Sequence, residues 1–173
     1  VARLGTAFQS STGYGLGAEW AIDGDPTTFT HTDSDDNAST WGVDFGNTVE
    51  VRRIVLRNRE SCCGSRLRDL TVQLIGSDGQ SVVWSSELLN PENLLGSPMT
   101  IELDLLESNV GAVPARLLRV TRTPDPDLSG GGGNADEDNV LSLGEVEVYG
   151  VETLSYGPWV QTDLATSMAD RSS

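Results

Sequence analysis

Apolar and polar residues alternate with a period of two along much of this chain, and that pattern limits the folds open to it. In MTIELDL, residues 99–105, Ile101 and Leu103 share one face while acidic residues occupy the other. The segment EVEVYG, residues 145–150, repeats the same pattern. Because successive side chains of a β-strand point to opposite faces, both segments are predicted to be half-buried strands.

Five further segments have the composition of strands, since they are aliphatic or β-branched and are bounded by Gly, Pro, Asn or Asp. These are residues 41–46, 49–58, 70–76, 81–86 and 116–123. Helical spacing is scarce and is confined to two short segments, residues 17–23 and residues 90–96, where Pro91 suits a first turn. The pattern predicts an all-β sandwich, and we expect a jelly roll.

The length of 173 residues suits one domain with a substantial core. We expect that domain to occupy residues 1–150, with residues 151–173 forming a C-terminal tail or a linker. Residues 123–139 are rich in Pro, Gly and acidic residues and are expected to form a long loop before the last strand.

The charge balance is strongly acidic, with 11 Lys and Arg against 26 Asp and Glu. Nucleic acids and anionic membranes attract clustered basic surface, so neither is an expected partner. No apolar run approaches the roughly 20 residues that a membrane-spanning helix needs. We therefore expect no membrane insertion.

The segment RNRESCCGSR, residues 57–66, places the only two cysteines side by side among three arginines. Cys62 and Cys63 have three possible states. They can be free thiols, or zinc ligands, although zinc sites usually separate paired cysteines by at least two residues and His31 is the only histidine. They can also form a disulfide between neighbours, which requires a tight turn because adjacent Cα atoms lie only about 3.8 Å apart. Gly64 is expected to give that turn its freedom.

A disulfide between neighbouring cysteines is rigid and polarisable, and here guanidinium groups would flank it. Such a surface would suit a ligand with one apolar face and several hydroxyls, such as a sugar. The chain resembles the F-type lectins, or fucolectins, in the order and approximate spacing of several segments. These segments are LGTAFQSST (4–12), AIDGD (21–25), HT (31–32), WGVDFG (41–46), NRESCCGSRL (58–67) and LSLGEVEVYG (141–150). The resemblance spans residues 1 to about 150 and implies a discoidin-like sandwich of the galactose-binding-like superfamily.

The resemblance implies a lectin for terminal L-fucose on fucosylated glycoconjugates. His31, Arg59 and Arg66 fall at the family's fucose-binding positions, where each would donate hydrogen bonds to sugar oxygens. Arginine is suited to this because it carries five donors and stays charged near neutral pH. Cys62 and Cys63 fall on the family's vicinal disulfide, which packs against the sugar ring.

Two departures from the family pattern stand out. Ser61 replaces an aspartate that supports the arginines, leaving Glu60 or Asp69 as the nearby acids able to take that role. Family members often also join two cysteines at the positions of Phe29 and Gly144. Both halves of that disulfide are missing together, which leaves no orphan thiol.

The segment WAIDGDPTT, residues 20–28, resembles the family's calcium loop. Calcium takes six to eight oxygen ligands. The resemblance implies carboxylates from Asp23 and Glu145, further oxygens from Asp25 and Thr28, and carbonyls from Trp20 and Gly144. The alternative is an Asp-Gly turn that holds no metal.

Catalysis is not expected. A glycoside hydrolase needs two carboxylates facing each other across a sugar, and only Glu60 adjoins the Arg and Cys cluster in the sequence. The alternative function is a discoidin-like adhesion module that binds another glycan or a non-sugar partner. Homo-oligomerisation or further modules of a longer chain would add avidity. A vicinal disulfide would require an oxidising compartment, so secretion or surface display is expected.

Overall fold

The computed structural model describes residues 1–125 and 138–152, which form strands and short 3-10 turns. The strands are β1 (Thr6–Gln9), β2 (Thr40–Arg57), β3 (Leu70–Ile75), β4 (Val82–Ser85), β5 (Thr100–Asp104), β6 (Val113–Arg122) and β7 (Glu145–Glu152). The turns are η1 (Ala2–Leu4), η2 (Ala18–Ala21), η3 (Gly64–Arg66) and η4 (Pro91–Asn93). The two short helical segments expected from the sequence are thus single 3-10 turns, η2 and η4.

Strand β2 belongs to both layers of the fold. Its first half pairs with β1 and β6, and its second half pairs with β5 and β7, with every pairing antiparallel. The sequence predicts two strands here, but the structure has one, whose register shifts between Asp44 and Val49. Asp44 accepts a hydrogen bond of 2.8 Å from the N–H of Gly46, whose φ of +78° suits glycine. This local turn bends the strand without ending it.

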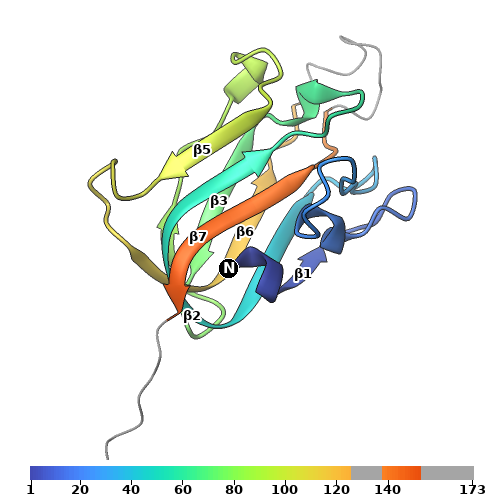
Figure 1. The fold of residues 1–173 in the computed structure, drawn as a ribbon. Coiled ribbons are helices and arrows are strands. Elements are labelled where there is room, and N and C mark those ends of the chain that lie inside the picture. Colours follow the sequence, from blue (N-terminus) through green and yellow to red (C-terminus); the bar gives the residue numbers. More distant parts are fainter. Residues whose placement is uncertain (126–137, 153–173) are drawn as a thin grey trace, which may run out of the picture.

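The first layer has the strand order β1-β2-β6-β3-β4, and β5 and β7 flank the far half of β2 (Figure 1). The alternation predicted for residues 145–150 is present, because Val146 and Val148 are buried. The core lies between the layers and includes the side chain of Trp41, whose indole N–H donates to the carbonyl of Ala18 at 2.9 Å. The expected all-β jelly-roll sandwich is confirmed.

Most of the expected loop at 123–139, and nearly all of the expected tail at 151–173, lie outside the described residues. The described ends of the loop meet, because the N–H of Asp125 donates to the carbonyl of Asp138 at 2.8 Å. The N-terminal amine of Val1 donates to the carbonyl of Val148 at 2.8 Å, which holds η1 against β7. Within the described ranges, no helix has the length and apolarity to cross a membrane.

Candidate functional site

A cavity of about 350 Å³ at one end of the sandwich gathers all five residues expected to bind sugar. Three segments distant in sequence line it with Tyr14, Leu16, Phe29, His31, Arg59, Cys62, Cys63 and Arg66. Sequence reasoning did not assign Tyr14, Leu16 or Phe29 to this site. Periodicity carries no signal for residues that meet through loops.

Cys62 and Cys63 form a disulfide in the structure, with their Cα atoms 3.8 Å apart. The residue that adopts the left-handed conformation is Cys63, with φ of +67°, and not Gly64 as the sequence suggested. Gly64 instead packs closely, since a Cβ there would lie 3.2 Å from the Cβ of Ser97. Asn58 braces the loop by donating to the carbonyl of Gly64 at 2.8 Å. Cys62 is exposed at the cavity wall.

His31 and Arg66 are both buried and lie in contact, with Nη1 of Arg66 3.0 Å from Nε2 of His31. A guanidinium group has no acceptor, so Nε2 must accept this hydrogen bond. The other ring nitrogen, Nδ1, lies 2.6 Å from the carbonyl of Thr32, which can only accept. The imidazole is therefore neutral with its proton on Nδ1, and Nε2 is an acceptor here rather than the expected donor.

The buried Arg122 holds the backbone of Arg66 in place. Nη1 of Arg122 donates to the carbonyl of Arg66 at 2.8 Å, and the N–H of Arg66 donates to the carbonyl of Cys63 at 3.1 Å. Burial lowers the pKa of Arg122 to about 10, so the side chain stays charged at neutral pH. The backbone that carries Arg66 and the disulfide is thus anchored to β6.

Arg59 is buried, lines the same cavity and contacts Ser61, Ser142 and Phe29. Its Nε and Nη2 lie 3.3 and 3.2 Å from Oγ of Ser61, and its Nη1 lies 3.4 Å from Oγ of Ser142. Its Cζ lies 3.6 Å from the centre of the Phe29 ring. Ser61, which replaces the family's aspartate, still accepts hydrogen bonds from Arg59.

Asp69 and Glu60, the two acids expected to compensate for Ser61, make contacts elsewhere. The carboxylate of Asp69 accepts from Nε of Arg68 at 2.5 Å and from the N–H of Glu92 at 2.8 Å. Glu60 is exposed and lines a different cavity. The prediction that Glu60 or Asp69 holds the site arginines therefore finds no support in these contacts.

Tyr14 stands at the mouth of the cavity. Its ring meets that of His31 edge to face, with the centroids 5.1 Å apart, and 86% of the residue is exposed. Tyr14 and Leu16 add apolar surface to a cavity that otherwise presents guanidinium groups and sulfur. The arrangement offers donors, one imidazole and apolar contacts to a single small ligand.

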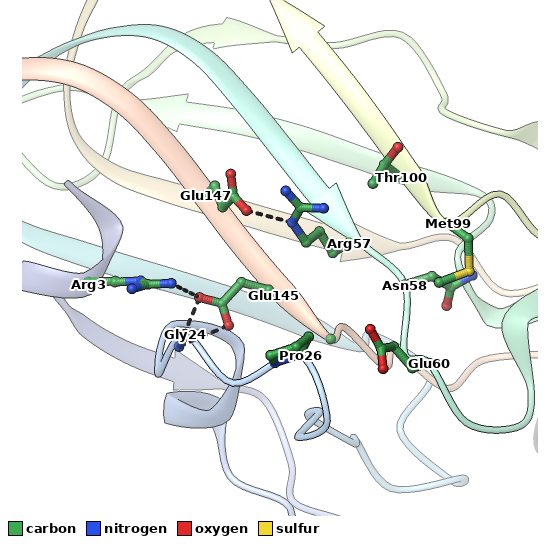
Figure 2. Close-up of a pocket in the computed structure, with 11 residues that line it drawn as sticks. Arg3, Gly24, Pro26, Arg57, Asn58, Glu60, Met99, Thr100, Glu145 and Glu147 are labelled. Atoms are coloured by element: carbon green, nitrogen blue, oxygen red, sulfur yellow. Dashed lines mark hydrogen bonds and ion pairs between the residues drawn. The ribbon is translucent and has the colours of Figure 1, made fainter.

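Gly24 and Pro26 of the expected calcium loop line a second cavity, of about 320 Å³, together with Gly144 and Glu145 (Figure 2). Glu145, which is 4% exposed, accepts from the N–H of Gly24 at 3.1 and 3.3 Å. Nη2 of Arg3 lies 3.6 Å from the same carboxylate (Figure 2). Burial raises the pKa of Glu145, because the charged carboxylate is removed from water.

Several oxygens of the loop crowd around Oγ1 of Thr28. It lies 3.2 Å from the carbonyl of Trp20, 2.9 Å from that of Asp25, and 3.1 and 2.9 Å from the carboxylate of Asp23. One hydroxyl proton cannot serve all of these acceptors. The side chain of Asp25 turns away to accept from Thr27, so its carbonyl is the oxygen in the cluster.

These donors are oxygens of mixed kind, as calcium sites require. Within residues 1–125 and 138–152, no three His, Cys, Asp or Glu side chains gather in a way that could hold a metal ion. A metal in this loop would therefore depend on main-chain carbonyls and the Thr28 hydroxyl as well as on carboxylates.

Residues 20–104 match the family model described as a NedA-like, galactose-binding domain. No curated protein matches the chain in sequence. The matched range contains the cavity residues from Phe29 to Arg66 and the whole calcium-like loop at residues 20–28.

Solved structures extend the likeness to most of the chain. The lectin domain of lectinolysin, solved with the Lewis B antigen, is 29% identical with a TM-score of 0.67, over 86% of this chain and 94% of that one. A fucose binding module of Streptococcus pneumoniae is 25% identical with a TM-score of 0.67, over 86% of this chain and 92% of that one.

A fucolectin from striped bass (Morone saxatilis) serum is 22% identical with a TM-score of 0.64, over 87% of this chain and 48% of that one. At that identity, the fucolectin supports the shared fold. The two structures that are at least 25% identical are a lectin domain and a binding module, which agrees with the prediction that the chain is not an enzyme.

Proposed function

We propose that this chain is a lectin of the discoidin-like, galactose-binding-like superfamily that binds terminal L-fucose on glycoconjugates. One observation carries the proposal, namely that His31, Arg59 and Arg66 line the same cavity as the Cys62–Cys63 disulfide. Two relatives that are at least 25% identical are a fucose binding module and a lectin domain solved with a fucosylated antigen, which supports the choice of sugar.

The chemistry of the cavity suits a deoxy sugar. L-Fucose carries adjacent hydroxyls and a ring oxygen, and its C6 is a methyl group attached to C5. Arg59 and Arg66 can donate to such oxygens, and Nε2 of His31, whose single lone pair accepts from Arg66, holds that guanidinium in the cavity. The exposed disulfide and Leu16 offer apolar, polarisable surface for the ring and the methyl group.

A second candidate is a module that binds another glycan, and the description of the matched family as galactose-binding favours it. The two candidates differ in their need for the disulfide and the arginines. A fucose lectin loses its ligand when these groups change, whereas a discoidin-like adhesion module that uses another surface does not.

Calcium is proposed as a structural ion of the loop at residues 20–28. The convergence of Trp20, Asp23, Asp25 and Thr28 oxygens, with the buried Glu145 on β7 beside them, fits a hard cation. The carbonyl of Gly144 would add a further ligand. A bound ion would balance the negative charge of these oxygens and join the loop to the start of β7. The ion would not contact the sugar, because the proposed sugar contacts all come from protein side chains.

A single small cavity should bind a monosaccharide weakly, so avidity would come from a homo-oligomer or from further modules of a longer chain. The vicinal disulfide favours an oxidising compartment, and we propose secretion or display at the cell surface.

The test is a glycan array probed with the purified protein in calcium-containing buffer. The proposal predicts signal on glycans with terminal L-fucose and its loss when the fucose is removed enzymatically. Binding that follows terminal galactose and ignores fucose would favour the second candidate.

A further inference from the structure

We propose that Phe29 is a positioning residue of the sugar site, because it fixes the plane of the Arg59 guanidinium. The inference rests on the proposed function, since it names a further determinant of the same site. Nothing in the local sequence around Phe29 indicates a role in ligand binding.

The stack between Phe29 and Arg59 is close and sheltered. Cζ of Arg59 lies over the Phe29 ring, 3.6 Å from its centroid, so the two groups are in direct contact. Arg59 is 7% exposed, and Phe29 is half-buried at the wall of the same cavity. Cation–π attraction strengthens as the pair loses water, so this stack restricts rotation of the guanidinium out of its plane.

The position of Phe29 is itself fixed by its neighbour in sequence. The N–H of Thr30 donates to the carbonyl of Leu143 at 2.8 Å, and the N–H of Leu143 donates to Oγ1 of Thr30 at 3.1 Å. These bonds tie the segment that carries Phe29 to the segment that precedes β7. The ring therefore reaches Arg59 from a backbone that is held at the next residue, Thr30.

Gly144 packs directly against the backbone of Asn58 and Arg59. A Cβ at Gly144 would lie 2.5 Å from the carbonyl oxygen of Asn58 and 3.3 Å from Cα of Arg59. The N–H of Gly144 also donates to the carbonyl of Arg57 at 2.9 Å. The absence of a side chain at Gly144 lets the chain before β7 pack directly beneath Arg59, while Phe29 covers its guanidinium.

The contacts with Gly144 and Phe29 position different parts of Arg59. Gly144 permits the backbone position, and Phe29 sets the orientation of the charged end, whose edges meet Ser61 and Ser142. A guanidinium recognises sugar oxygens through donors in its own plane, so a fixed plane determines which pair of oxygens it can reach. Phe29 thereby affects recognition without being required to touch the sugar.

The test compares three variants by calorimetric titration with L-fucose. Phe29→Leu keeps the apolar bulk but removes the aromatic face, Phe29→Tyr keeps the face, and Phe8→Leu removes a partly exposed aromatic ring on β1 away from the cavity. We expect Phe29→Leu to weaken binding by about three- to thirtyfold, and the other two to stay within about twofold of the original protein. Equal affinity in Phe29→Leu and the original protein would overturn the inference.

A second measurement separates this inference from the proposed function. The ring face should shift the ¹H resonance of the Arg59 Nε–H upfield in the ligand-free protein, and Phe29→Leu should abolish that shift while Phe29→Tyr retains it. If the original protein ignored L-fucose, the proposed function would fail while this signal could still be present. An Arg59 resonance unchanged by Phe29→Leu would overturn the positioning role whatever the ligand.

Discussion

Nη1 of Arg66 lies 3.0 Å from Nε2 of His31, so the cavity holds an arginine and a neutral histidine as one hydrogen-bonded unit. The carbonyl of Thr32 fixes the tautomer from the other side of the ring. Because Arg66 only donates, any change that removes the lone pair of Nε2 removes this partner from a buried cation.

We predict that His31→Leu weakens binding of L-fucose by at least about tenfold, because a buried charged donor loses an acceptor. His31→Gln, which offers an amide oxygen, should recover part of the affinity. Calorimetry measures both, and circular dichroism checks that the fold is kept. Affinity unchanged in His31→Leu would show that the pair has no part in binding.

Gly13 is predicted to be essential for the position of His31. A Cβ there would lie 2.8 Å from Nδ1 of His31 and 2.9 Å from the carbonyl of Thr32. Gly13→Ala should therefore displace the imidazole and reduce fucose affinity by about tenfold or more, a 1 Å shift being enough to disrupt a polar contact. Gly76→Ala, in the turn between β3 and β4, serves as the control and should bind normally. Normal binding by Gly13→Ala would be inconsistent with this geometry.

Replacing both cysteines should affect binding far more than stability. The disulfide joins neighbours in sequence, so it closes almost no loop and removes little entropy from the unfolded chain. Cys62→Ser combined with Cys63→Ser should leave the melting temperature within about 4 °C, while fucose affinity drops clearly. Thermal denaturation and calorimetry on the same preparations measure the two effects. A large loss of melting temperature with intact affinity is the contrary result.

The all-β architecture could be predicted from the sequence because apolar residues alternate with a period of two in half-buried strands. In residues 145–150, for example, Val146 and Val148 are buried as expected. The sequence did not show that the segments at 41–46 and 49–58 form one strand. Their continuity depends on a turn at Gly46 and on partners from both layers.

The candidate site was predictable where residue type and order sufficed. His31, Arg59, Arg66 and the cysteines do share one cavity, although their roles in binding remain proposals. The supporting residues were not predictable, because Phe29 meets Arg59 across 30 positions of sequence and Arg122 meets Arg66 across 56. Such contacts arise from tertiary packing and leave no local pattern.

Stability should depend on Asp36 in a pH-dependent way. Burial raises its pKa, but hydrogen bonds from Ser10, Ser11 and the N–H of Ala38 outweigh burial and leave the pKa below its usual value. A lowered carboxyl pKa gives stability that is present above the unfolded pKa of about 3.9 and is lost as the pH falls through the folded pKa. This carboxylate therefore stabilises the fold at neutral pH.

We predict that Asp36→Asn lowers the free energy of unfolding at pH 7 by about 1 kcal/mol. The difference seen at pH 7 should shrink at an acidic pH, as the pH falls through the lowered folded-state pKa and Asp36 becomes protonated in both states. Urea denaturation at the two pH values measures this, with the exposed Asp35→Asn as the control. A difference that stays constant with pH would contradict the assignment.

Arg3 is predicted to compete with calcium for Glu145. Its guanidinium lies 3.6 Å from the Glu145 carboxylate and covers Gly24 (Figure 2). Arg3→Gln should lower the melting temperature in chelator and increase the rise that calcium produces, because a ligand stabilises in proportion to its affinity for the folded state. Arg57→Gln, which removes the partner of Glu147, is the matched control and should leave the calcium response unchanged. A melting temperature indifferent to calcium in every variant would argue against the metal.

We propose that one cavity binds L-fucose through Arg59, Arg66, His31 and the Cys62–Cys63 disulfide. Calorimetric titration of L-fucose into the original protein and into Arg59→Ala tests it most directly. We predict saturable heat with one site per chain for the original protein and no measurable heat for Arg59→Ala. The same binding heat from both proteins would contradict the account.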